Sequence, residues 1–211
     1  MPRRGFGLST TPTETAAQVR RDYYLALGRF VSQFAHTEGL MQLTLRHFAG
    51  LGDDIGSALL SGVRADQARD LINRVLDARR RPATKMELKR HFDHFGLITK
   101  IRNDILHYGV EFETTEILLI SNDRDAHIPE KLRETRITTR DLQKMTDDLL
   151  VIRSGLFAAI DRGRVAKDEQ DKWDGRANVP WQYKPSPQAV PRHSSRKTPA
   201  TRSRPPSSSR H

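Results

Sequence analysis

Three side chains that could act together on a phosphodiester lie within the segment 102–107. Arg102, Asn103 and His107 occupy this segment, and a Tyr-Gly pair follows it directly. An arginine can bind a phosphate through two parallel hydrogen bonds and stabilise negative charge that develops on it. A histidine can exchange protons near neutral pH. These residue types fit cleavage of RNA without a metal ion.

Helical geometry decides which of these side chains share a face. Asn103 and His107 are four residues apart, which places them about 40° apart around a helix of 3.6 residues per turn. Arg102 lies about 140° from His107, so only its long side chain could bring the guanidinium round. The predicted position of His107 near a helix C-terminus favours the imidazolium form through the helix dipole, which suits a general acid. The spacing permits a common site without requiring one.

The segment resembles the Arg-Asn-x-x-x-His motif of the HEPN superfamily, a group of small all-helical domains of prokaryotes and eukaryotes. The sharp match covers 101–109, where Ile101, Ile105 and Leu106 surround the polar residues, and the resemblance as a whole is expected to cover residues 14–161. Many HEPN proteins are metal-independent ribonucleases, including toxins of toxin–antitoxin pairs. Others have lost catalysis and serve as binding modules.

The resemblance implies roles for the three residues. Arg102 would clamp the scissile phosphate, Asn103 would position His107 or the phosphate, and His107 would act as general base or acid for attack by the 2′-hydroxyl, leaving a cyclic phosphate. HEPN sites are typically built at a two-fold interface. A homodimer is therefore expected, in which Arg102 of one chain could serve His107 of the other. RNA is the expected substrate, an antitoxin is a candidate protein partner, and neither a metal nor another cofactor is expected.

Glu38 is a fourth candidate for the site. It falls on the apolar stripe of the first predicted helix, one turn from Phe34. A buried carboxylate costs free energy unless it meets a cation or hydrogen-bond donors. Glu38 could orient Arg102 or His107, as acidic residues of an early helix do in some HEPN members. Alternatively, the stripe bends slightly and Glu38 reaches solvent.

Composition restricts the class of protein. The chain has 211 residues, no cysteine and a mean hydropathy of −0.66, which predicts one domain with a disordered part and excludes disulfide scaffolds and thiol catalysis. There is no apolar run of membrane-spanning length and no apolar segment of a secretory signal, so a cytoplasmic protein is expected. His91 and His94 lack a third ligand in a recognisable pattern, and we interpret them as packing or surface residues rather than metal ligands.

Positive charge gathers at the C-terminal end. Residues 162–211 contain 12 Lys and Arg against 4 Asp and Glu, whereas the other 161 residues contain 24 against 22. Because Pro, Ser and Arg dominate the end of the chain, we predict a domain over residues 1–163 and a disordered basic tail over residues 164–211. This tail is either an arm that follows a phosphate backbone or a solvated extension with no specific partner. The candidate nucleic-acid contacts of the arm are Arg192, Arg196, Lys197, Arg202 and Arg204.

Three aromatic residues, Trp173, Trp181 and Tyr183, lie at the root of the predicted tail. Their rings could stack on bases of a single-stranded nucleic acid. They could equally dock back onto the domain, and the sequence leaves both alternatives open.

Helices are expected to position the motif. The predicted elements are a first helix capped by Thr11 and ended by Gly50, a short helix over 53–61, a helix over 65–80, the motif helix opened by a capping box at 84–87 and ended at 108–109, strands within 110–120 and 131–138, and a last helix capped by Thr138. They predict a mainly α fold, a four- or five-helix HEPN-like bundle with a small β-hairpin between its last two helices.

Two other classes of function stay open. In a non-catalytic helical module that binds a protein or a nucleic acid, Arg102, Asn103 and His107 would be structural polar residues that tie the motif helix to the first helix. Asp104 favours this alternative, because it places a negative charge where a phosphate must approach. The third class is a DNA-binding protein driven by its basic tail.

Overall fold

The computed structural model of the chain describes residues 12–123, 132–162 and 164–185. In this part of the chain it has six helices: α1 (Pro12–Ala49), α2 (Asp53–Leu60), α3 (Ala65–Ala78), α4 (Pro82–Tyr108), α5 (Thr139–Asp161) and α6 (Lys167–Ala177). Together with a small sheet, they confirm the prediction of a mainly helical bundle. None of the helices within the described residues is long and apolar enough to cross a membrane.

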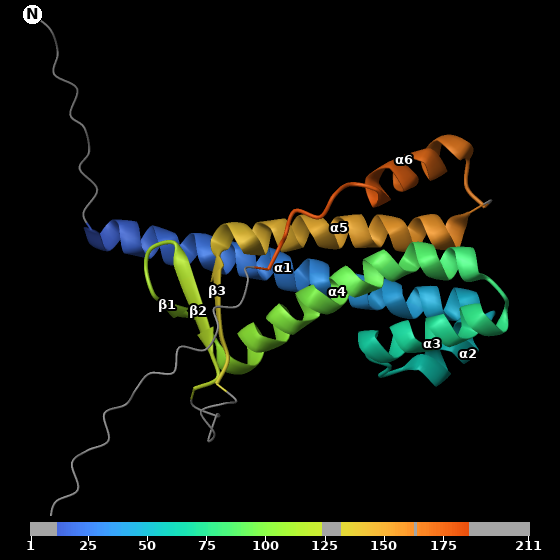
Figure 1. The fold of residues 1–211 in the computed structure, drawn as a ribbon, viewed down its shortest axis with the longest axis horizontal. Helices are drawn as coiled ribbons and strands as arrows, with labels where there is room; N and C mark the ends of the chain where they lie inside the picture. The colour runs from blue at the N-terminus through green and yellow to red at the C-terminus, as the bar shows by residue number, and fades with distance from the viewer. Residues whose placement is uncertain (1–11, 124–131, 163, 186–211) are drawn as a thin grey trace, which may run out of the picture.

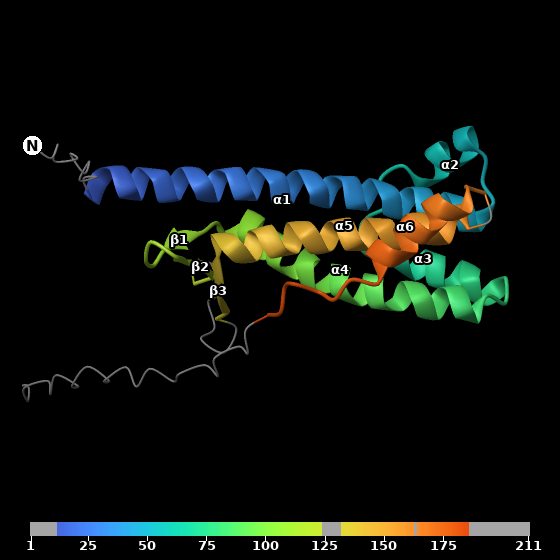
Figure 2. The same ribbon diagram turned by 90° about the horizontal axis from the view of Figure 1, so that it is seen from above.

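Three long helices form the body of the molecule. α5 lies along α1, and α4 runs beside them with its C-terminal end directed toward the sheet (Figures 1 and 2). α2 and α3 lie at the opposite end, against the second half of α1 (Figure 1). The motif of α4 therefore lies where the helical body meets the sheet.

The apolar stripe predicted for the first helix forms one wall of the core. Phe30, Phe34 and Met41 of α1 have essentially no exposed surface, because apolar residues spaced three or four apart turn one face of the helix toward α4 and α5. The ring of Phe34 stacks on that of Phe95 of α4, with centroids 5.0 Å apart. α1 and α4 are thus in direct contact through side chains a short way before the motif.

Local signals fix two of the predicted helix ends. Thr138 caps α5: its hydroxyl accepts a hydrogen bond from the backbone N–H of Asp141, whose carboxylate accepts one from the backbone N–H of Thr138. α4 ends at Gly109, whose φ of 72° is rarely adopted by other residues and whose N–H donates to the Ile105 carbonyl. The cap predicted at Thr11 lies outside the described residues.

The predicted start of the motif helix is wrong by most of a turn. α4 begins at Pro82 rather than after a cap at Thr84. Proline favours the first helical position, because its fixed φ suits a helix and the N–H that it lacks would have no partner there. Glu87, the second member of the predicted capping box, instead accepts a hydrogen bond from Arg162 at 2.6 Å.

The predicted hairpin is part of a three-stranded antiparallel sheet. β2 (Ile117–Ser121) pairs with β1 (Glu111–Phe112) on one side and with β3 (Glu134–Thr138) on the other. Leu118 and Ile137 face each other across β2 and β3, and both are buried against the bundle. The alternation of buried and exposed residues along these strands is that of a sheet with one face on the core.

The folded part of the chain continues past the predicted boundary at residue 163. α6 follows α5, and residues 178–185, here called the C-terminal strap, return along the bundle (Figure 1). The prediction of disorder is therefore wrong for residues 164–185, because Trp173 packs on Phe157 and Tyr183 is buried. The sheet accordingly lies between α4 and α5, not between the last two helices. The predicted tail contacts lie outside the described residues: Arg192, Arg196, Lys197, Arg202 and Arg204.

Candidate active site

Arg102, Asn103 and His107 lie in the last two turns of α4, as predicted. The structure brings the first two together: Arg102 Nη1 donates a hydrogen bond to Asn103 Oδ1 at 3.0 Å. The guanidinium carbon also lies 4.9 Å from the centroid of the Phe34 ring of α1, which is within the range of a cation–π interaction. The half-buried Arg102 is therefore directed toward α1 and is held by an amide and an aromatic ring.

One donor of Arg102 stands out. Its Nε atom is buried and has no hydrogen-bond partner among the described residues. A buried N–H without an acceptor costs about 1–3 kcal/mol, and buried donors of this kind are uncommon in folded proteins. A hydrogen-bond acceptor brought to this Nε–H group would therefore remove the cost of leaving it unpaired.

His107 lies apart from Arg102. Its side chain is exposed in the last turn of α4, and its ring centroid lies 6.4 Å from that of Tyr108. Within the described part of the chain, His107 makes no hydrogen bond or ion pair, so both ring nitrogens can reach a ligand. The two motif residues that would act on a phosphate therefore do not meet within one chain, in agreement with their helical spacing of about 140°.

Glu38 is placed beside the site without being paired to it. It is half-buried on α1, one turn beyond the Phe34 ring that Arg102 covers. Among the described residues, Glu38 forms no ion pair with either Arg102 or His107. The predicted orienting role is therefore not in place within a single chain.

Two further residues lie beside the motif, and no sequence pattern predicts a functional role for either of them. Arg133, just before β3, donates from Nη2 to the hydroxyl of Tyr108 at 3.2 Å. The sequence pattern marks Tyr108 only as the end of the helix, and 25 residues separate it from Arg133. This contact depends on the sheet folding against the end of α4, which no local pattern in the sequence specifies.

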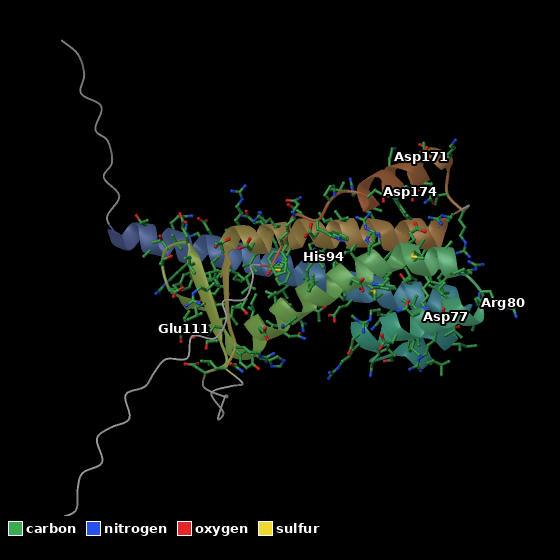
Figure 3. The ribbon with its side chains drawn as sticks, viewed as in Figure 1. Asp77, Arg80, His94, Glu111, Asp171 and Asp174 are labelled. Carbon is green, nitrogen blue, oxygen red and sulfur yellow. The ribbon has the colours of Figure 1, made fainter. Side chains whose placement is uncertain are left out.

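A second polar cluster lies between α4 and α5, where Figure 3 labels His94. His94 Nε2 lies 2.8 Å from Oδ2 of the completely buried Asp148. Asp148 also accepts hydrogen bonds from the backbone N–H groups of Gln182 (2.8 Å) and Tyr183 (2.9 Å) in the C-terminal strap. The His94 ring stacks on Trp181 with centroids 4.2 Å apart. This cluster attaches the strap to the bundle.

His91 completes the attachment of the strap. Its buried ring meets the Trp181 ring edge-on at 5.6 Å. A Cβ atom at Gly155 of α5 would lie 2.3 Å from His91 Nε2, so only glycine leaves room for the imidazole. Both histidines of the predicted pair are thus packing residues, as interpreted. The described residues contain no group of three His, Cys, Asp or Glu that could hold a metal ion.

The stability of the fold should fall in acid because of His91. Burial, followed by the nearby charges of Arg90 and His94, lowers its pKa from 6.5 to about 4. The unfolded chain therefore binds more protons between these values, and unfolding free energy is lost as the pH falls from 6.5 to 4, by about 3 kcal/mol from this group. We expect urea denaturation of His91→Gln to depend less on pH in this window than that of the wild type. Equal pH dependence of the two proteins would contradict the assignment.

An open cleft of about 700 Å³ lies elsewhere on the molecule, between the first half of α1, the turn before β2 and the start of α5. Arg29 and Arg140 line it together with the acidic residues Asp22, Glu116 and Asp147. None of the four predicted catalytic residues lines this cleft. Its mixed charge does not select one class of ligand, so the motif at the end of α4 is the stronger candidate.

No protein-family model, curated protein or solved structure matches the chain. The resemblance to HEPN proteins thus rests on the motif at 101–109 alone. A function for the chain has to be proposed from the side chains at the end of α4 and the chemistry that they allow.

Proposed function

We propose that the chain is a metal-independent endoribonuclease of the HEPN type. The observation that carries the proposal is the placement of the motif at one exposed end of α4: Arg102 is held by Asn103 at 3.0 Å, and the imidazole of His107 is accessible. A guanidinium and an imidazole are the two groups that cleavage of a phosphodiester most needs from a protein without a metal.

The proposed reaction is an internal transfer at phosphorus. The 2′-oxygen of the substrate forms a bond to the phosphorus as the bond from phosphorus to the 5′-oxygen breaks, and the product ends in a cyclic phosphate. A neutral His107 takes the proton of the 2′-hydroxyl, and the imidazolium that results gives this proton to the leaving 5′-oxygen. Arg102 stabilises the negative charge that grows on the phosphate oxygens, and Asn103 holds the guanidinium through its amide oxygen.

A homodimer would complete this site. In one chain, Arg102 is directed toward Phe34 while His107 is exposed. If the ends of two α4 helices face each other across a two-fold axis, Arg102 of one chain comes close to His107 of the other, and both sites are formed at once. A ribonuclease of this kind would harm its own host. The proposal therefore includes a role in a toxin–antitoxin pair or in defence, with an antitoxin protein as restraining partner.

The direct test is cleavage of RNA by the purified protein in the presence of a metal chelator, with analysis of the ends. We expect cyclic-phosphate ends with the wild type and none with His107→Ala. The matched control is His36→Ala, which removes an exposed histidine of α1 and should leave cleavage unchanged. A wild type as inert as His107→Ala, with the fold intact, would overturn the proposal.

A second candidate function is a non-catalytic helical module. It is favoured by the packing of Arg102 against Phe34 and by its buried Nε, because a guanidinium held in this way can serve to tie α4 to α1. The half-buried Asp104, two residues further along α4, carries a negative charge that would repel a phosphate. Growth of the host on expression separates the two candidates, because a nuclease should slow growth in a manner that depends on His107 and a binding module should not.

A further inference from the structure

The sheet places a cation against Tyr108, the residue that follows His107. Tyr108 follows His107 directly, and the Tyr108 hydroxyl accepts a hydrogen bond from Nη2 of Arg133 at 3.2 Å. The end of α4 and the start of β3 are thereby joined next to the exposed imidazole. Within one chain, this guanidinium belongs to the same end of the molecule as His107, whereas that of Arg102 is directed to α1.

Arg133 is fixed in place through its backbone. Its N–H donates to the side-chain oxygen of the buried Asn122 at 2.6 Å, and its carbonyl accepts from the N–H of Asn122 at 3.3 Å. These two bonds join the end of β2 to the start of β3. The side chain itself is exposed, and among the described residues its only hydrogen bond is the one to Tyr108. Because a guanidinium carries five N–H donors, most of them can bind a ligand.

Arg133 also differs from its neighbour on the sheet, Arg136, in whether a carboxylate balances its charge. Arg136 donates to both carboxylate oxygens of Glu113, at 2.8 and 3.0 Å, so its charge is balanced. In the part of the chain that the structure describes, Arg133 has no carboxylate partner. An exposed, positioned and unbalanced guanidinium is the arrangement that binds a phosphate most readily.

We infer that Arg133 and Tyr108 form, together with His107, a binding site for a backbone phosphate of single-stranded RNA. Arg133 binds two phosphate oxygens, and the Tyr108 hydroxyl, which already accepts from Arg133, donates its proton to the same phosphate. The adjacent rings of His107 and Tyr108 offer a surface against which a neighbouring base can stack. This inference rests on the proposed function for its ligand, but it assigns the same-chain cation to the sheet rather than to the motif.

The test measures binding of a fluorescently labelled single-stranded RNA to the full chain over a series of salt concentrations. The RNA carries a 2′-O-methyl group on every ribose, which removes the nucleophile of the proposed reaction and prevents cleavage during the measurement while His107 stays in place. Arg133→Ala should weaken binding about tenfold at low salt and reduce the slope of log affinity against log salt by about 0.7, the value for one phosphate contact on a single strand. Arg136→Ala serves as the matched control and should change neither quantity.

Two further variants keep the result interpretable. Arg133→Lys preserves the charge and should restore most of the salt slope. If the loss in the alanine variant came only from a disturbed sheet, lysine would not restore the slope. Tyr108→Phe removes the hydroxyl alone and should weaken binding about threefold without changing the slope. Equal affinities and slopes for the Arg133→Ala and Arg136→Ala proteins would overturn the inference, as would the absence of any RNA binding.

These results separate the inference from the proposed function. If binding depends on Arg133 while the wild type cleaves no RNA, the phosphate site stands and the ribonuclease proposal falls. If the wild type cleaves RNA and the Arg133→Ala protein keeps the same salt slope, the ribonuclease proposal stands and the phosphate site falls.

Discussion

Replacing Asp148 by alanine is expected to lower the free energy of unfolding by about 3–5 kcal/mol and to detach the C-terminal strap. Its carboxylate is completely buried and accepts hydrogen bonds from His94 and from two backbone N–H groups of the strap. Alanine would leave the His94 ring and two backbone N–H groups without this acceptor, and each buried donor left without a partner costs about 1–3 kcal/mol. Urea denaturation measures the loss, and hydrogen exchange should show the amides of Gln182 and Tyr183 becoming unprotected.

Asp147 provides the matched control for this change. It neighbours Asp148 in α5, but its side chain is exposed, so Asp147→Ala should change the unfolding free energy by no more than about 0.5 kcal/mol. The effect expected at Asp148 is thus one of burial and not of helical propensity or net charge. A cost below about 1 kcal/mol for Asp148→Ala would mean that the strap is not held by this carboxylate.

The parts of the fold that the sequence predicts are those determined by neighbouring residues. The buried face of α1 follows from apolar spacing, the start of α5 from the reciprocal bonds of Thr138 and Asp141, and the end of α4 from Gly109. The start of α4 was missed because two valid signals compete there, and the proline at 82 outweighs the cap at Thr84.

The strap could not be predicted because its determinants are far apart in the sequence. Trp181 and Tyr183 stand in a segment whose composition is that of a disordered chain. They are held by Asp148, which lies more than 30 residues earlier, and by His94, which lies 54 residues before Asp148. The average composition of a segment does not reveal the few residues that attach it to the domain. The spacing of His91 and His94 argues against a metal site, but it does not predict that Trp181 packs on these two rings.

In the candidate site too, features set by neighbouring residues could be predicted, and contacts between residues far apart in the sequence could not. Helical geometry separates Arg102 from His107, and the structure keeps them apart. The contact of Arg102 with Phe34 and that of Tyr108 with Arg133 both join residues distant in sequence. The types of the catalytic candidates could therefore be predicted from sequence, whereas the directions of their side chains could not, because these depend on α1 and the sheet.

Chains that each lack one motif residue should restore each other's activity. In the proposed ribonuclease, Arg102→Ala and His107→Ala are each expected to lower RNA cleavage by roughly a hundredfold or more, since removing one stabilising donor or one proton-transferring group has effects of this size. If each site takes Arg102 from one chain and His107 from the other, half of the randomly mixed dimers contain one complete site of two. The mixture should then recover about a quarter of the wild-type rate.

The complementary mixture distinguishes a shared site from two independent ones. A chain with both substitutions, mixed equally with wild-type chains, forms heterodimers in which no shared site is complete, because every site meets at least one alanine. Only wild-type homodimers then cleave, and the rate falls to about a quarter; sites contained within one chain would retain about half. Since Arg102 and His107 do not meet in one chain, we expect a quarter. If half of the wild-type rate were retained, the arginine that acts with His107 would belong to the same chain. Arg133 would then be the candidate for this arginine.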